Sequence, residues 1–152
     1  MIEAMTMAAQ TAAMAEDWPQ FKAKTLADGS VIWTGPLEAE HQTFVVAVHY
    51  APGMEFPWVQ VIRPRLVQRP DFEEGPLPHV YWRGDEPGPC LFDPLQNEWD
   101  ASMAISRTTV PWTADWLYFY EIWSMTGKWL GGGRHRGQPI PIKPQQNDEV
   151  TS

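Results

Sequence analysis

Residues 43–50 read TFVVAVHY and end at Ala51-Pro52-Gly53. This run is rich in β-branched and aromatic residues, which favour a strand, and the Pro-Gly pair after it is typical of a turn. Similar runs lie on either side: residues 30–34 (SVIWT), ending at Gly35-Pro36, and residues 58–64 (WVQVIRP), in which apolar and polar residues alternate. Because the connections are too short to hold crossover helices, the three runs predict an antiparallel meander.

Two helices are predicted to accompany this sheet. Residues 8–23 are rich in alanine, although Pro19 interrupts them and can instead begin a short second turn after Asp17. Residues 113–127 (TADWLYFYEIWSMTG) begin with Thr113 as a candidate N-cap and end at Gly127. Their aromatic residues recur at helical spacing, so that one face can lie on the sheet: Trp116, Phe119, Tyr120 and Trp123. The expected fold class is α+β, with about four antiparallel strands.

The composition predicts one domain of modest size. The chain has 152 residues, and we expect residues 1–137 to form a single domain and residues 138–152 a flexible polar tail. The formal net charge of −8 disfavours nucleic acid or an anionic membrane as partner, and no apolar run is long enough to span a bilayer. A single cysteine excludes an internal disulfide framework, so a cytoplasmic setting is expected.

The stretch between Gln68 and Trp99 is the candidate site. It is rich in proline and lacks periodicity, which predicts a long loop, and long loops inside a compact domain are more often functional than idle. Residues 71–100 hold eight acids and one base, Arg83, for a net charge of −7. The loop carries Cys90, a candidate nucleophile if its thiolate is accessible and otherwise a small buried hydrophobe. The scattered histidines have no zinc-ligand spacing, so neither a metal nor a cofactor is expected.

Residues 78–99 (PHVYWRGDEPGPCLFDPLQNEW) carry a family resemblance. The segment resembles the active-site region of ubiquitin-conjugating (E2) enzymes, in which a His-Pro-Asn element and a glycine turn precede a Cys-Leu pair and a later tryptophan. Here His79 lies eleven residues before Cys90, Cys90-Leu91 matches, and Trp99 follows nine residues on. The order of helix, meander, cysteine loop and second helix also matches, over roughly residues 15–127. The resemblance implies an E2-like fold, shortened at its C-terminal end.

More specifically, the chain resembles the stand-alone bacterial E2-like proteins of short type II CBASS antiphage operons. The matching features are Pro78-His79, residues 90–92 (CLF), the aromatic helix 116–123, and residues 126–133. The resemblance implies that Cys90 takes the C-terminus of a cGAS-like nucleotidyltransferase as a thioester and passes the acyl group to an amine of a lysine-bearing acceptor protein.

One departure from the family pattern concerns catalysis. The pattern places an asparagine two residues after its histidine, whereas this chain continues from His79 to Val80 and Tyr81. His79 is then either a catalytic residue or a structural one that ties the loop, and Tyr81 or backbone N–H groups are the other groups that can stabilise an oxyanion. Asp93 is a candidate carboxylate for orienting the incoming lysine, and Trp99 a supporting residue.

Two other functions are compatible with these residues. One is a non-catalytic adaptor on the same fold, which binds and stabilises its partner; the missing asparagine favours it, and the Cys-Leu pair favours catalysis. The other is an aromatic-lined binder of a sugar or a peptide, unrelated to E2 enzymes, which predicts a buried and unreactive Cys90.

Overall fold

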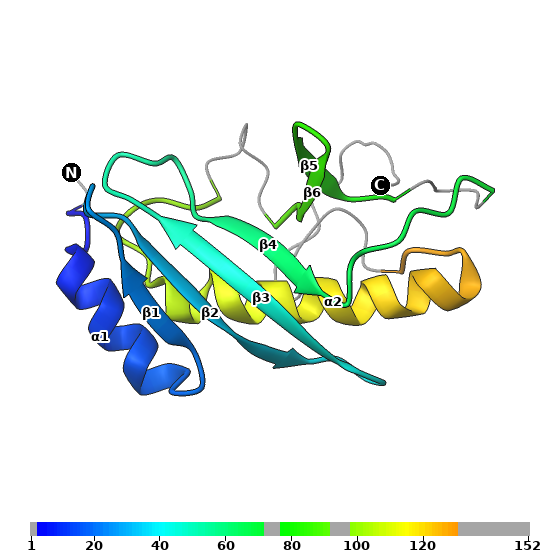
Figure 1. Ribbon diagram of the computed structural model, residues 1–152, viewed down its shortest axis with the longest axis horizontal. Coiled ribbons are helices and arrows are strands. Elements are labelled where there is room, and N and C mark those ends of the chain that lie inside the picture. Colours follow the sequence, from blue (N-terminus) through cyan, green and yellow to red (C-terminus); the bar gives the residue numbers. More distant parts are fainter. Residues whose placement is uncertain (1–2, 72–76, 92–97, 131–152) are drawn as a thin grey trace.

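The computed structural model describes residues 3–71, 77–91 and 98–130 and confirms the α+β class. Strands β1 to β4 form one antiparallel sheet in sequence order, and β5 and β6 form a separate antiparallel hairpin (Figure 1). The elements follow the chain in this order: α1 Met7–Asp17, β1 Lys22–Thr25, β2 Val31–Glu38, β3 Thr43–Tyr50, β4 Trp58–Arg63, β5 Val80–Arg83, β6 Glu86–Pro89, the 3-10 turn η2 Ile105–Arg107 and α2 Thr109–Thr126.

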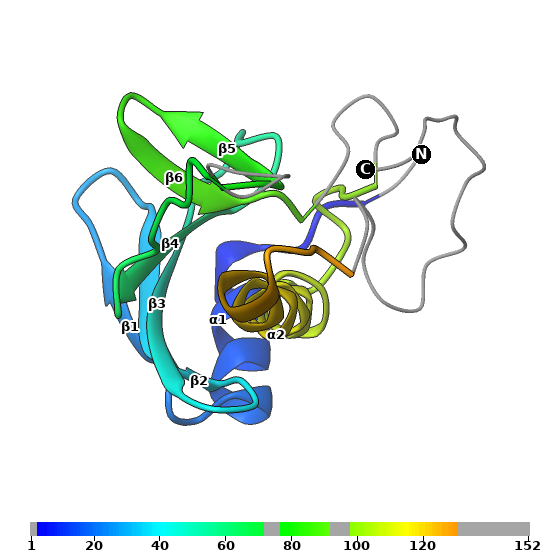
Figure 2. The ribbon, with the colours of Figure 1, turned by 90° about the vertical axis from the view of Figure 1, so that its right-hand side faces the viewer.

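The sheet curves around α2, which lies along its concave side (Figure 2). Alternate residues of β2 are buried because successive side chains of a strand point to opposite faces. These side chains and those of β3 pack against the apolar face of α2, as the aromatic spacing predicted. The most deeply buried aromatic residues of this core are Trp33, Phe44 and Trp123.

Helix α2 begins four residues earlier than predicted. Thr113 is not its N-cap: the side chain is buried within the helix, and its hydroxyl donates to the carbonyl oxygen of Thr109. The prediction was wrong because it relied on the N-cap preference of threonine at residue 113, whereas the helix already includes Pro111, which fits the first turn, where N–H groups have no helical partner. The predicted end is confirmed, since Gly127 adopts a left-handed conformation with φ 81°.

The N-terminal prediction was too long. Helix α1 ends at Asp17, and residues 22–25 form β1, paired with β2. All four residues of β1 are exposed, so this strand shows no alternation of apolar and polar residues by which the sequence could have revealed it. The main sheet has four strands, as predicted, and the sequence had indicated the positions of three of them, β2, β3 and β4.

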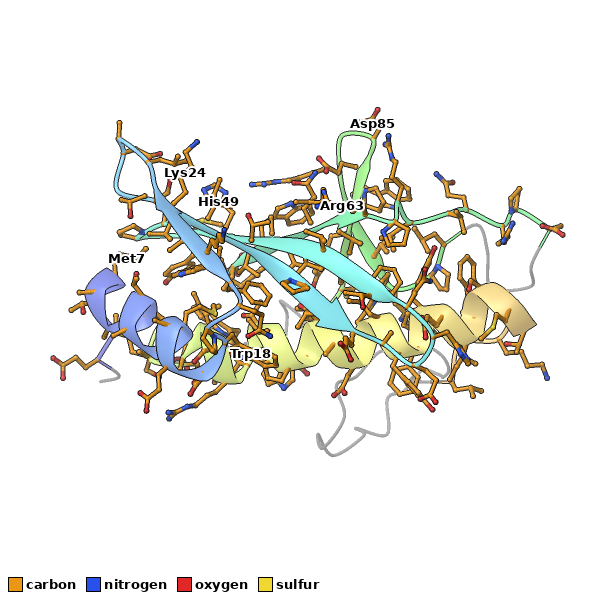
Figure 3. The ribbon with its side chains drawn as sticks, turned by 60° about the horizontal axis from the view of Figure 1, so that its bottom comes forward. Met7, Trp18, Lys24, His49, Arg63 and Asp85 are labelled. Atoms are coloured by element: carbon orange, nitrogen blue, oxygen red, sulfur yellow. The ribbon has the colours of Figure 1, made fainter. Side chains whose placement is uncertain are left out.

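The stretch predicted as one long loop contains the hairpin of β5 and β6. Figure 3 shows Asp85 at the tip of this hairpin, which projects beyond the main sheet. Each strand has four residues, and two prolines fall in β6, so neither strand has the length or the composition that a sequence pattern requires. The hairpin packs beside β4 through β6.

A fully buried amide joins α1 to the segment before α2. The Gln10 Nε2 group donates to the carbonyl oxygen of Met103 at 2.9 Å, and Gln10 Oε1 accepts from the N–H of Ile105 at 2.9 Å. The Gln10 side chain is 0% exposed. Both backbone groups therefore depend on this side chain, because water does not reach it.

We predict that Gln10→Leu lowers the free energy of unfolding by about 3 kcal/mol, because it leaves a buried N–H and a buried C=O without their side-chain partner. Urea denaturation measures the change. The matched control is Gln20→Leu, at an exposed residue, which should stay within about 0.5 kcal/mol of wild type. Equal effects of the two substitutions would contradict the role assigned to Gln10.

Candidate functional site

The β5–β6 hairpin fixes the backbone at Cys90. The N–H of Cys90 donates to the carbonyl oxygen of His79 at 2.9 Å, which extends the pairing of the two strands by one residue. Because the N–H groups of a strand alternate in direction, the nitrogens of Pro87 and Pro89 face away from β5. Proline has no N–H to lose at these two positions, so the Glu-Pro-Gly-Pro-Cys sequence favours pairing on one edge of β6.

The carbonyl oxygen of His79 accepts a second hydrogen bond, from the indole Nε1 of Trp116 at 2.8 Å. Trp116 belongs to α2, so this oxygen connects the end of the hairpin to the helix that packs on the concave side of the sheet. His79 has φ 59°, in the left-handed region that few residues other than glycine adopt. The position of Cys90 is thus set by α2 through one peptide carbonyl.

The imidazole of His79 lies in an aromatic environment. Its ring centroid is 4.9 Å from that of Trp129, which in turn lies 5.3 Å from Trp116. Burial lowers the pKa of His79 from 6.5 to about 4, because the charged form loses its hydration. The ring is therefore neutral at physiological pH.

Cys90 itself is half-buried, between anchored neighbours. Leu91, the next residue in the chain, is buried. Leu77, shortly before β5, is also buried. As a whole, the residue Cys90 is therefore not enclosed in the core. A half-buried thiol on a fixed backbone is compatible with attack on an acyl group that approaches from solvent.

The structure brings some of the predicted site residues together and not others. His79, Tyr81 and Cys90 share the hairpin, and Tyr81 stands opposite Gly88, two residues before Cys90. Trp99 lies in the core instead: its Nε1 donates to the Thr108 hydroxyl at 3.0 Å, and its ring meets Tyr50 edge-on. Asp93 and the predicted tail 138–152 lie outside the described residues.

A pocket of about 330 Å³ lies on the hairpin beside the start of β4. Phe56 and Tyr81 stack there, with ring centroids 5.7 Å apart, and the Arg83 guanidinium lies 4.6 Å above the Trp58 ring. The sequence analysis missed it, since only Tyr81 had been singled out. The signal was the aromatic pair around Pro57, just before β4. The lining residues are Met54, Glu55, Phe56, Trp58, Tyr81 and Arg83.

Among the described residues there is neither a cluster suited to a metal ion nor a membrane-spanning helix. Within residues 3–71, 77–91 and 98–130, no three His, Cys, Asp or Glu residues gather closely enough to hold a metal ion. Neither α1 nor α2 is both long and apolar enough to cross a membrane.

Comparison with known proteins identifies the family of the chain. A family model described as type II CBASS E2 protein matches residues 10–136. The match spans the whole meander, the hairpin with Cys90 and α2. No curated protein matches the chain significantly.

We predict that Trp116→Phe speeds amide hydrogen exchange at Cys90 by about fivefold, because it removes an N–H donor worth about 1 kcal/mol and keeps an aromatic ring. Exchange followed by NMR or mass spectrometry measures the effect. The matched control is Trp18→Phe, which removes a similar bond from Trp18 Nε1 to the Ser106 carbonyl oxygen. Faster exchange at Cys90 in both variants would contradict a specific role for Trp116.

We predict that His79 makes the protein less stable in acid. The unfolded chain binds a proton at this imidazole below pH 6.5, while the folded chain does so only near pH 4. The free energy of unfolding should therefore fall between pH 6.5 and 4, by up to about 3 kcal/mol.

Urea denaturation across this range, compared with His79→Asn, isolates the contribution. Asparagine tolerates the left-handed conformation and does not titrate, so the loss on acidification should be smaller in the variant. Parallel pH profiles for the two proteins would show that the imidazole is not held neutral.

Proposed function

Since the chain belongs to the family of type II CBASS E2 proteins, we propose that Cys90 carries a protein C-terminus as a thioester and transfers it to an amine. The family places the protein among the E2-like components of this antiphage defence system. The donor proposed here is the C-terminus of the cGAS-like nucleotidyltransferase, and the acceptor is a lysine side chain of a protein.

The observation that carries the proposal is the fixed backbone of the half-buried Cys90. The Cys90 N–H and the Trp116 indole meet at the carbonyl oxygen of His79, which holds the hairpin end against α2. Acyl exchange is faster when the sulfur is held at a fixed position relative to the incoming carbonyl carbon, because a fixed geometry removes much of the entropic barrier. A flexible loop would not supply this.

The chemistry balances as two acyl substitutions. The Cys90 thiolate attacks the carbonyl carbon of a donor acyl group that arrives as a thioester; the new carbon–sulfur bond forms and the donor thiolate leaves. A deprotonated lysine amine then attacks the Cys90 thioester, an amide forms, the amine loses a proton to solvent or a carboxylate, and the Cys90 thiolate leaves. Asp93 is the carboxylate that we propose for this last role.

We propose that His79 positions the loop and does not exchange protons. With a pKa of about 4, the ring is not in the imidazolium form that acts as a general acid at pH 7, and it is a weak base. The left-handed backbone of His79 fixes the direction of the chain where the hairpin begins. His79 positions the loop through its main-chain carbonyl oxygen, which accepts hydrogen bonds from the Cys90 N–H and the Trp116 indole.

The test is the intact mass of the protein after incubation with the nucleotidyltransferase whose C-terminus is supplied as a thioester, with and without thiol reductant. Wild type should carry an adduct that reductant removes. Cys90→Ser should carry a reductant-resistant oxyester or none, and Cys90→Ala should carry none. A nucleotidyltransferase without its terminal residue is the control for the donor.

Identical conjugate profiles for wild type and Cys90→Ala would overturn the transferase. Stable co-purification of Cys90→Ala with the nucleotidyltransferase would then identify the protein as an adaptor.

A further inference from the structure

The pocket beside the hairpin has the composition of a recognition site. Tryptophan, tyrosine, methionine and arginine are enriched where proteins bind one another, and four lining residues are Met54, Trp58, Tyr81 and Arg83. Its volume of about 330 Å³ is at the lower end for small-molecule sites, which run from about 300 to 1,000 Å³. This size suits one large side chain with its main chain.

The pocket walls are fixed by contacts within the protein. The Phe56–Tyr81 stack and the Arg83–Trp58 contact hold the hairpin against the loop before β4. At Gly88 a Cβ atom would lie 2.7 Å from the Val59 carbonyl oxygen and 2.8 Å from the Trp58 ring, so β6 and β4 approach as closely as glycine allows. A preformed pocket loses little entropy on binding.

The pocket lies within peptide reach of Cys90. Tyr81 is paired with Gly88, and Cys90 follows two residues later on the same strand. At about 3.3 Å per residue, Cys90 is about 7 Å along the strand from Gly88, a distance that about two residues of an extended peptide cover.

The polar groups at the pocket match a peptide main chain. Arg83 offers N–H donors, and Glu55 offers a carboxylate acceptor; both residues are exposed. An extended main chain presents C=O and N–H groups together, whereas a simple anion would meet the Glu55 charge and a simple cation the Arg83 charge.

We propose that this pocket docks an apolar side chain of the donor's C-terminal segment, at least about two residues before the carboxyl group that Cys90 receives. The inference rests on the proposed function for the identity of the donor. It assigns to the pocket the recognition of the donor, while Cys90 carries out the exchange.

The experiment titrates the protein with a synthetic peptide of the nucleotidyltransferase C-terminus and follows tryptophan fluorescence or heat. Cys90→Ala should bind it as wild type does, because docking does not need the thiol. Phe56→Ala and Arg83→Ala should each raise Kd about tenfold or more. Alanine at the docking position of the peptide should raise Kd to a similar extent.

The matched control is Trp82→Ala. Trp82 lies between Tyr81 and Arg83 in sequence, is 47% exposed and does not line the pocket. Its substitution should leave Kd unchanged. Arg83→Ala alters an exposed side chain, so this variant keeps the test decisive if Phe56→Ala does not fold.

The outcomes separate the two proposals. Peptide binding that needs Phe56 and Arg83, without any adduct on Cys90, would support the docking site and overturn the transferase. An adduct on Cys90 with unchanged Kd in both pocket variants would overturn the docking site alone. Binding of an oligosaccharide in this pocket, with no binding of the peptide, would overturn the docking site in favour of a glycan binder.

Discussion

The site depends on two hydrogen bonds that the carbonyl oxygen of His79 accepts. This oxygen accepts the N–H of Cys90 from one side of the hairpin and the indole N–H of Trp116 from α2. Residue 79 adopts a left-handed conformation where these elements meet, and its φ of 59° is the one positive value among described non-glycine residues. The helix that completes the core thus also positions Cys90, so that core packing and the placement of this cysteine depend on each other.

How much of this the sequence could predict depends on the range of the forces involved. The meander of β2 to β4 and the end of α2 at Gly127 were predictable, because alternation and a helix-ending glycine are local signals. Strand β1 was not, because its pairing to β2 leaves all its residues exposed. Likewise, the sequence identified Cys90, His79 and Tyr81, but the docking pocket depends on contacts between distant segments.

The neutral surroundings of His79 limit the chemistry that this site can support. An imidazole with a pKa of about 4 is uncharged at pH 7, and the ring of Trp129 lies against it. Exchange between two thioesters asks for little acid catalysis, because a thiolate is a good leaving group and the bonds broken and formed are alike. The structural role of His79 and the proposed reaction are therefore consistent, because the donor acyl group is already activated as a thioester when it reaches Cys90.

A site with so few acid or base groups gains most from positioning its substrate. Contacts that are equally strong before and during the reaction improve capture of the donor without lowering the barrier of the bound state. The pocket at Phe56 and Arg83 provides contacts of this kind, at a distance from the reacting carbonyl. The barrier itself falls only where the carbonyl is held against sulfur, and there the hydrogen bonds at His79 act. Recognition at the pocket and alignment at Cys90 are thus separate functions of one hairpin, joined through the strand that contains Gly88.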